Sequence, residues 1–259
     1  MNTEQLIREL KQALSQYSSV LKRAEMNVDR AKKTAKRAYE NVRYDIRSIR
    51  ERDPAARSDA EVALLYSGFH ALALYRVAHA LHKKKAYFPA RAISQAARFL
   101  TGIEIHPAAE IGRGLFIDHG SAVVIGETAV IGDDCTIYQG VTLGGTGKHV
   151  GKRHPTLGNR VMVGAGAKVL GPFKVGDGAK IAAGAVVLSE VPDDSTAVGV
   201  PAHIIDKNNL RASTEQMDQI HIPDPVAQEL CRLEVKIRAL EKKLEEAERT
   251  APRTEQKTK

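Results

Sequence analysis

The sequence contains no tryptophan, and aromatic residues make up only 5% of its 259 positions. Its core must therefore consist mainly of aliphatic side chains, because large rings are too few to fill it. The two cysteines, Cys135 and Cys231, lie far apart without CxxC spacing, which argues against a disulfide framework and against a cysteine-rich metal site. These features fit a cytoplasmic protein, and we expect one.

Export and membrane signals are also lacking. The first ten residues carry charges, and no apolar run of membrane-spanning length is present. The formal net charge of +8 could attract an anionic partner, but the basic residues near the C-terminus alternate with Glu, as on a solvated helix. We therefore expect no signal peptide, no membrane span and no nucleic-acid-binding surface.

The sequence does contain a repeat with a period of six. This period fits neither an α-helix nor an alternating strand, whereas short parallel strands wound into a triangular coil explain it. The aliphatic positions of the repeat are Ile105, Ile111, Ile117, Ile125, Ile131, Ile137, Leu143, Leu157, Val163, Val169, Val175, Ile181 and Val187. A second inward series, four positions later, comprises Ala109, Ser121, Ala129, Cys135, Val141, Ala167, Ala179 and Ala185. We expect Cys135 to pack in the core rather than carry an acyl group.

The repeat is interrupted twice. The step from Ile117 to Ile125 is eight residues, and the step from Leu143 to Leu157 is fourteen, so each adds two residues to whole turns. The chain is expected to leave the coil as a loop at both places, where a rigid scaffold can present functional groups. The second loop contains a glycine-rich segment, residues 144–148, whose spacing is not that of a P-loop, so no nucleotide triphosphate is implied.

Helical segments flank the repeat. Residues 3–50 contain no Pro or Gly and predict a helix with one break near residues 26–29, ended by Asp53-Pro54. A second helical region is expected at about residues 59–99. After the repeat, a heptad pattern comprises Val226, Leu230, Leu233, Ile237, Leu240 and Leu244. This last helix could join a three-stranded coil or pack on its own chain.

We therefore expect an α+β protein. Its parts are an N-terminal α-helical domain (1–102), a catalytic β-helix (103–205), a linker (206–222), a C-terminal heptad helix (223–248) and a disordered tail (249–259).

One histidine stands out as a candidate base. His119 lies at the eight-residue step, and Glu104 precedes it by fifteen residues, close to one turn of the coil. A carboxylate in that place can hold the imidazole in one tautomer and stabilise its charged form. A surface histidine at a coil corner is the alternative. No compact set of His ligands accompanies it, so we expect no metal.

The repeat resembles that of the hexapeptide acyltransferases, whose coils form a left-handed parallel β-helix. The motifs narrow the resemblance to the serine acetyltransferase family. They are Glu104-Ile105-His106-Pro107, Asp118-His119-Gly120, Val124-Ile125-Gly126-Glu127-Thr128 and Val141-Thr142-Leu143-Gly144-Gly145-Thr146-Gly147-Lys148. Upstream, the resemblance includes Arg52-Asp53-Pro54-Ala55 and Gly68-Phe69-His70, so it spans about residues 45–205.

The resemblance implies the roles of individual residues. It makes His119 the general base and Glu104 its partner, at a position where the family often has Asp. The residues near the substrate's amino group would be Asp53 and Asp118, and those near its carboxylate Arg153 and His154. The residues along the arm of the cofactor would be Gly145, Thr146, Ala165, Lys180 and Ala183.

The resemblance also implies the reaction and its partners. Acetyl-CoA and L-serine would give O-acetyl-L-serine and CoA, the first committed step of cysteine biosynthesis, with L-cysteine as a feedback inhibitor. A homotrimer or a dimer of trimers is expected. Family members often bind O-acetylserine sulfhydrylase through a terminal Ile, which this sequence lacks. Two rivals are a hexapeptide acyltransferase acting on an amino sugar or antibiotic, and a non-catalytic scaffold that docks through its C-terminal helix.

Overall fold

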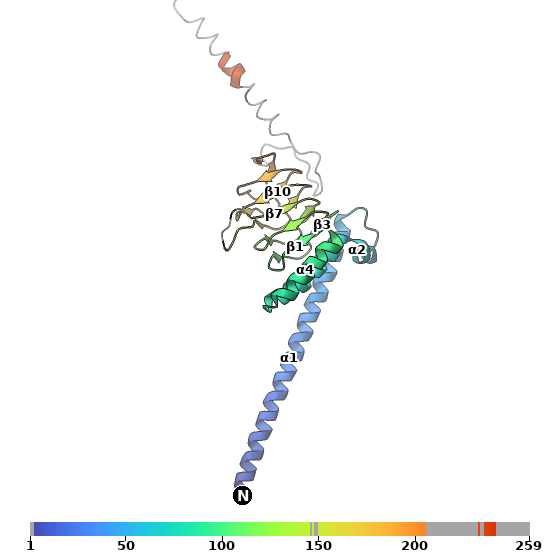
Figure 1. Cartoon of the computed structure of the whole chain (residues 1–259), viewed down its shortest axis with the longest axis vertical. Coiled ribbons are helices and arrows are strands. Elements are labelled where there is room, and N and C mark those ends of the chain that lie inside the picture. The colour runs from blue at the N-terminus through green and yellow to red at the C-terminus, as the bar shows by residue number, and fades with distance from the viewer. Residues whose placement is uncertain (1–2, 146, 148–149, 206–232, 234–235, 242–259) are drawn as a thin grey trace, which may run out of the picture.

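The computed structural model describes residues 3–145, 147, 150–205, 233 and 236–241. Four helices come first: α1 (Thr3–Arg52), α2 (Asp59–Leu65), α3 (Ser67–Lys83) and α4 (Tyr87–Thr101). A stack of short strands follows, and α1 extends away from it as a long rod (Figure 1). None of the described helices is long and apolar enough to cross a membrane.

The strands form three sheets that make the sides of a triangular prism. The first, sheet A, contains β1 (Glu104–Ile105), β4 (Val124–Ile125), β7 (Thr142–Gly144), β10 (Lys168–Leu170) and β13 (Val186–Val187). Sheet B contains β2 (Glu110–Ile111), β5 (Val130–Ile131), β8 (Thr156–Leu157) and β11 (Lys174–Val175). Sheet C contains β3 (Phe116–Asp118), β6 (Thr136–Tyr138), β9 (Met162–Val163), β12 (Lys180–Ile181), β14 (Thr196–Val198) and β15 (His203–Ile205).

The repeat positions account for the core of the prism. Apart from β15, which pairs antiparallel with β14, the strands pair in parallel from one turn to the next, so that Ile105, Ile125 and Leu143 stack in register. Apart from the partly buried Ile111, all the predicted aliphatic positions are buried. Most of the second inward series is also buried, including Cys135, whose thiol pKa burial raises to about 12. An aliphatic core built from one residue per side is therefore confirmed.

Two expectations from the sequence were wrong. Ser121 is exposed, and Val123 fills the inward slot instead, because the two extra residues of the eight-residue step move the register of that turn. The expected break near residues 26–29 is also absent, and α1 is continuous from Thr3 to Arg52. No Pro or Gly occurs there to interrupt the backbone hydrogen bonds. As expected, α1 ends just before Asp53-Pro54.

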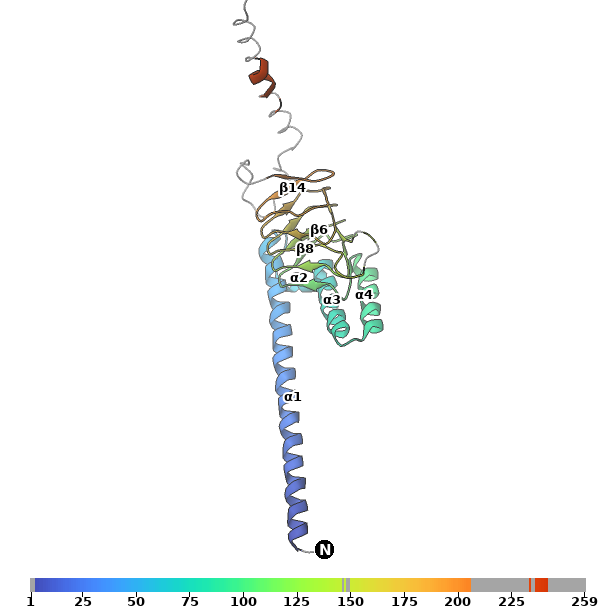
Figure 2. The same ribbon diagram turned by 90° about the vertical axis from the view of Figure 1, so that its left-hand side faces the viewer.

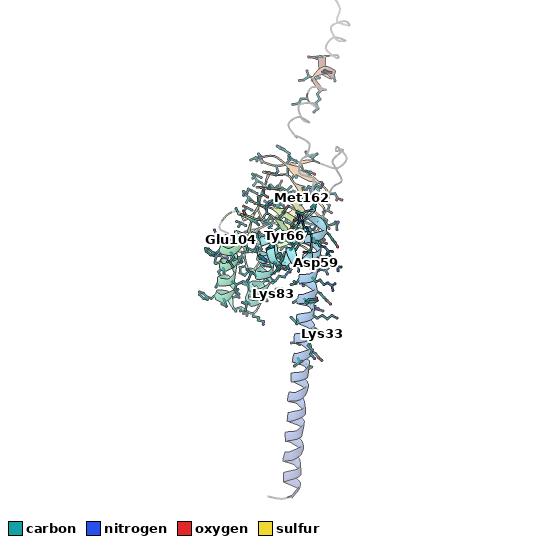
Figure 3. The ribbon with its side chains drawn as sticks, turned by 90° about the vertical axis from the view of Figure 1, so that its right-hand side faces the viewer. Lys33, Asp59, Tyr66, Lys83, Glu104 and Met162 are labelled. Carbon is teal, nitrogen blue, oxygen red and sulfur yellow. The ribbon has the colours of Figure 1, made fainter. Side chains whose placement is uncertain are left out.

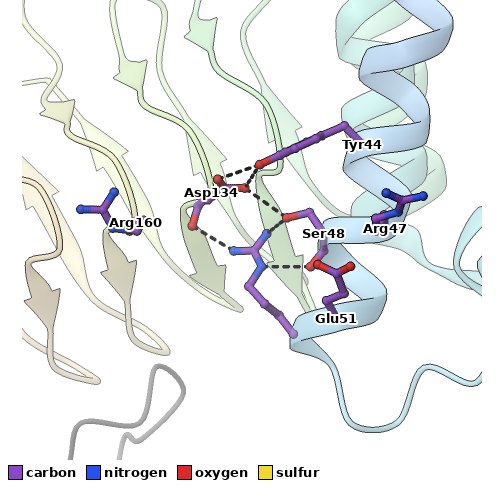
Figure 4. Close-up of a pocket in the computed structure, with 7 residues that line it drawn as sticks. Tyr44, Arg47, Ser48, Glu51, Asp134 and Arg160 are labelled. Carbon is purple, nitrogen blue, oxygen red and sulfur yellow. Dashed lines mark hydrogen bonds between the residues drawn. The ribbon is translucent and has the colours of Figure 1, made fainter.

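The C-terminal end of α1 is anchored at the corner between sheets B and C. The Arg52 guanidinium, most of which is buried, donates to the carbonyls of Gly114, Asp134 and Cys135. Tyr44 and Ser48 donate to the Asp134 carboxylate, and these residues line a cavity of about 340 Å³ (Figure 4). This network fixes the end of α1 on the prism, and with it the position of the segment that follows.

Helices α3 and α4 pack against one another beside the first turns of the prism (Figure 2). Ser94 on α4 donates a 2.7 Å hydrogen bond to the carbonyl of Ile105, and Tyr75 on α3 donates one of 2.6 Å to Ala109. The described part of the heptad helix exposes Leu233, Ile237 and Leu240. The expected linker, the tail and the rest of that helix lie outside the described residues.

Candidate active site

His119 lies at the corner between sheets C and A, in the turn that joins β3 to β4. We call residues 119–123 the His119 corner. Three of them have positive φ: His119 (58°), Gly120 (74°) and Ala122 (60°). A left-handed conformation is costly for histidine and alanine, and such residues occur often at functional sites. The turn holds the imidazole outside the prism, with 76% of the side chain exposed.

Two carboxylates lie beside this corner. Asp118 precedes His119, and its Oδ1 is 4.0 Å from Nε2 of the imidazole. Burial raises the pKa of the Asp118 carboxyl, the nearby charge of His119 opposes that rise, and the charge of Asp53 adds to it. Asp53 comes from the segment after α1, so the fold brings together two acids 65 positions apart in the sequence.

Tyr66 connects the helical segment to these acids. Its hydroxyl donates a 2.7 Å hydrogen bond to Oδ2 of Asp53. Burial, followed by this hydrogen bond and the charge of Asp53, raises the pKa of Tyr66 to about 12. Gly68 permits this arrangement, because a Cβ there would lie 2.2 Å from the carbonyl oxygen of Ile117 on β3. The start of α3 can therefore lie directly against the strand that carries Asp118.

Glu104 lies one turn below the His119 corner. The amide of Glu104 donates to Val123, and that of Ala122 donates to Gly102, so the two turns stack directly. Among the described residues, the ion-pair partners of the Glu104 carboxylate are Arg98, at 3.2 Å, and Arg91, at 3.9 Å. Both arginines belong to α4, and Glu104 lies on that side of the prism (Figure 3). The ion pair found for His119 is with Asp118.

A second set of polar residues lies at a different corner, between sheets A and B. We call residues 126–129 with residues 150–155 the Arg153 corner. Arg153 forms an ion pair with Glu127, which lowers the pKa of that carboxyl. The hydroxyl of Thr128 accepts from the backbone amides of Arg153 (2.9 Å) and His154 (3.1 Å). These two hydrogen bonds fix residues 153–154, where the long loop ends, to the turn that carries Thr128.

His154 is buried at this corner with only 8% of its surface exposed. The Thr128 amide donates to its Nδ1, so Nε2 carries the proton of the neutral ring. Burial lowers the pKa of His154, and the neighbouring Arg153 lowers it further. A Cβ on Gly126 would lie 2.0 Å from the ring, so glycine is required there for the imidazole to occupy its place.

The residues expected along the cofactor arm are divided in the same way. Ala165 and Ala183 occupy the turns above the His119 corner, and Lys180 begins β12 on sheet C. The amide of Gly184 donates to the Ala165 carbonyl (2.8 Å), so these turns are directly stacked. Gly145 starts the loop that leads to Arg153, and Thr146 lies outside the described residues.

One copy of the chain thus brings Asp53, Asp118 and His119 together but holds Arg153 and His154 at another corner. Sequence reasoning gave no role to Tyr66, Glu127 or Thr128. Glu127 and Thr128 lie within the motif at residues 124–128. In the sequence, Tyr66 is distinguished only as an aromatic residue within a predicted helical region. Within the described part of the chain, no group of three or more His, Cys, Asp or Glu could hold a metal ion.

Residues 3–73 match the family Serine acetyltransferase, N-terminal, and residues 154–189 match Bacterial transferase hexapeptide (six repeats). The serine acetyltransferase of Helicobacter pylori (strain ATCC 700392 / 26695) is 67% identical over 168 residues, which are 65% of this chain and 98% of the relative. This chain belongs to the serine acetyltransferase family. It is an acyltransferase. The Bacillus subtilis (strain 168) serine acetyltransferase is 53% identical over 208 residues, 80% of this chain and 95% of the relative.

Solved structures of serine acetyltransferases share the fold. One in complex with cysteine is 41% identical, with a TM-score of 0.70, over 75% of this chain and 76% of its own. One in complex with CoA is 42% identical (TM-score 0.64; 68% and 73%). The Neisseria gonorrhoeae enzyme in complex with serine is 42% identical (TM-score 0.64; 66% and 70%). The predicted fold class, helices followed by a left-handed parallel β-helix, is confirmed.

Proposed function

We propose that this serine acetyltransferase transfers the acetyl group of acetyl-CoA directly to the hydroxyl of L-serine, with His119 as general base. The observation that carries this proposal is the convergence of Asp53 and Asp118 beside the imidazole at one corner. Two carboxylates favour the binding of an ammonium group. A histidine beside them can accept the proton of a hydroxyl group on the same substrate molecule. L-Serine presents both an ammonium and a hydroxyl.

The remaining substrate group requires a second copy of the chain. The carboxylate of serine needs a cationic partner, and Arg153 and His154 lie at a different corner of the prism. In a closed ring of three prisms, each contact joins two different surfaces, so the His119 corner of one copy can lie against the Arg153 corner of the next. We therefore propose a homotrimer in which each site takes residues from two subunits. Two such trimers could associate through α1.

In the proposed reaction, His119 accepts the proton of the serine hydroxyl as the oxygen attacks the acetyl carbonyl. A C–O bond forms, the C–S bond of the thioester breaks, and the departing thiolate takes the proton from the imidazolium. The products are O-acetyl-L-serine and CoA. Glu104 stabilises the charged imidazole from the turn below. Neither a metal ion nor a covalent enzyme intermediate takes part.

We propose that acetyl-CoA lies between subunits along the turns that contain Ala165, Ala183 and Lys180, facing Gly145 and Thr146 of the neighbour. Small residues at these turns let the pantetheine arm approach backbone amides and carbonyls. The serine acetyltransferase solved with CoA supports this class of ligand. L-Cysteine would compete at the serine site, because it shares the ammonium and carboxylate, and another relative was solved with cysteine.

The first test is thiol release from acetyl-CoA by the purified protein with L-serine, D-serine, L-threonine, an amino sugar or no acceptor. We expect release that depends on L-serine. Replacing His119 by Asn, which tolerates positive φ, should reduce kcat by about 100-fold or more with the assembly intact. An amino sugar as the preferred acceptor, or near-normal turnover by His119→Asn, would contradict the proposal.

A second test addresses the shared site. A His119→Asn subunit and an Arg153→Ala subunit are each inactive alone but carry complementary defects. Every mixed trimer then contains one junction with both corners intact, so random reassembly of equal amounts should recover about a quarter of normal activity. Recovery requires the two residues to act across a junction. Mixing that exchanges subunits without recovering activity would place each site within one chain.

A further inference from the structure

The structure shows two arginines directed at Glu104, the carboxylate that the proposed reaction assigns as partner of the base. Arg98 and Arg91 are seven residues apart on α4, two helical turns, so they share one face of the helix. Their guanidinium groups lie 3.2 Å and 3.9 Å from the Glu104 carboxylate. Neither the motifs nor the repeat had indicated a role for these residues.

The face of α4 that carries the arginines is also the face that fixes the helix on the prism. Ser94, only 3% exposed, lies between them and donates to the carbonyl of Ile105, the residue after Glu104. Ala90 and Ala97 on the same side are buried. Small side chains and one short hydrogen bond therefore hold the helix against β1. The arginines are thereby placed around a glutamate whose side chain is 24% exposed.

We propose that Arg98, assisted by Arg91, is a positioning residue that holds the Glu104 carboxylate and moderates its charge toward His119. This inference rests on the proposed role of Glu104 as partner of the general base. A glutamate has one more rotatable bond than the aspartate often found in the family, so its carboxylate needs an anchor to stay in one orientation. A planar guanidinium, with several donors in fixed directions, suits that purpose.

The anchor affects the charge that surrounds the base. Asp118 on β3 lies beside His119, Asp53 after α1 lies near Asp118 and accepts from Tyr66, and Glu104 on β1 lies one turn below the His119 corner. The cations that face Glu104 are Arg91 and Arg98, both on α4. Carboxylates near an imidazole favour its charged form. By pairing with Glu104, Arg98 offsets part of the negative charge that this carboxylate presents to the turn that carries His119.

The prediction concerns the acid limb of kcat/KM, which reports the pKa of the base in the free enzyme. Arg98→Met should move this limb to higher pH by about half a unit, because Glu104 then acts on His119 without a counter-charge. Arg98→Lys should restore most of the wild-type profile, and Arg91→Met should have a smaller effect. KM for serine should stay unchanged. Arg113→Met is the matched control, since it removes an exposed arginine paired with Asp133 at the far corner.

A double-variant comparison separates this inference from the proposed function. Glu104→Gln should move the acid limb to lower pH, and Arg98→Met should add little in that background. If Glu104→Gln leaves the profile unchanged, the proposed partner of the base is wrong. If Glu104→Gln shifts the pH profile and Arg98→Met does not, the proposed role of Arg98 is wrong. It is also wrong if Arg98→Met shifts the profile by the same amount in the wild-type protein and in the Glu104→Gln variant. A lower Tm with an unchanged profile would show only a stabilising ion pair.

Discussion

The Tyr66 hydroxyl donates a hydrogen bond of 2.7 Å to Asp53, and so joins the start of α3 to the segment after α1. Asp53 also holds its own turn, since its Oδ1 accepts from the amide of Ala55 at 2.8 Å. One carboxylate thus bonds a local amide with one oxygen and a phenol with the other. The proposed ammonium site therefore depends on Tyr66, a residue from the helical segment that packs against the cluster containing Phe116 of β3.

Removing this phenol should weaken serine binding. Tyr66→Phe deletes the hydrogen bond but keeps the ring, and a bond to a charged acceptor contributes about 1.5–3 kcal/mol. Because Asp53 then loses its fixed orientation, KM for L-serine should rise by about tenfold. KM for acetyl-CoA should not change. The control is Tyr39→Phe, on an exposed part of α1. Equal effects on both substrates would exclude a specific role in the serine pocket.

The anchor of α1 should affect both stability and serine binding. Arg52→Met leaves the carbonyls of Asp134 and Cys135 without their guanidinium donor and removes a largely buried charge. We expect a loss of about 2–4 kcal/mol in the free energy of unfolding, measured by urea denaturation. KM for serine should also rise, because Asp53 follows Arg52 directly.

Arg47→Met is the control for this anchor, since Arg47 is exposed and lines the same cavity. It should change neither the free energy of unfolding nor KM for serine appreciably. If Arg52→Met destabilises the protein while leaving serine binding intact, the position of Asp53 does not depend on the anchor.

The close approach of Gly126 to His154 allows a test of the Arg153 corner. In Gly126→Ala the new Cβ would lie 2.0 Å from the imidazole, so the ring must leave its place beside Thr128. Activity should fall by about the same factor as in His154→Ala, on the order of tenfold or more. The two changes combined should reduce kcat/KM little beyond either one, because both displace the same group. Additive losses would indicate that Gly126 acts elsewhere.

The imidazoles of His154 and His106, which are buried and partly buried, predict how stability depends on pH. Burial lowers the pKa of both His154 and His106, so the folded state favours their neutral forms. Their contribution to stability is complete above the unfolded pKa of about 6.5, and it is lost as the pH falls from there toward the lowered folded values. Tm should drop between pH 7.5 and pH 5, and His154→Gln should drop less. An equal decline in both proteins would exclude His154 as a source.

The repeat could be predicted from the sequence because every turn of the prism requires an inward aliphatic residue on each side. The six-residue period therefore appears directly in the order of the amino acids. The exchange of Ser121 for Val123 was missed because a two-residue insertion shifts the register within one turn. Contacts between distant segments could not be predicted. The hydrogen bond between Tyr66 and Asp53 and the ion pair between Arg98 and Glu104 depend on where the helices lie relative to the rest of the fold. No local sequence pattern indicates that position.

The sequence did not predict that the site residues lie at two separate corners of the prism, and the reason is different. His119 and Arg153 both lie at interruptions of the repeat, and the sequence predicted two loops without indicating which corners they occupy. Counting whole turns assigns them to different corners, since β3 belongs to sheet C and β7 to sheet A. The motifs therefore identified site residues as a set, whereas the structure separates that set into two halves on one chain.

The eight-residue step gives the His119 corner a further property. The strands on either side of it pair in the same register as their neighbours, so the prism continues as though the extra residues were absent. An insertion or deletion of two residues there could thus create or remove the base without disturbing a single inward side chain. A change in chain length within a single turn therefore places a histidine outside the prism and leaves the stacking of the turns below and above it unchanged.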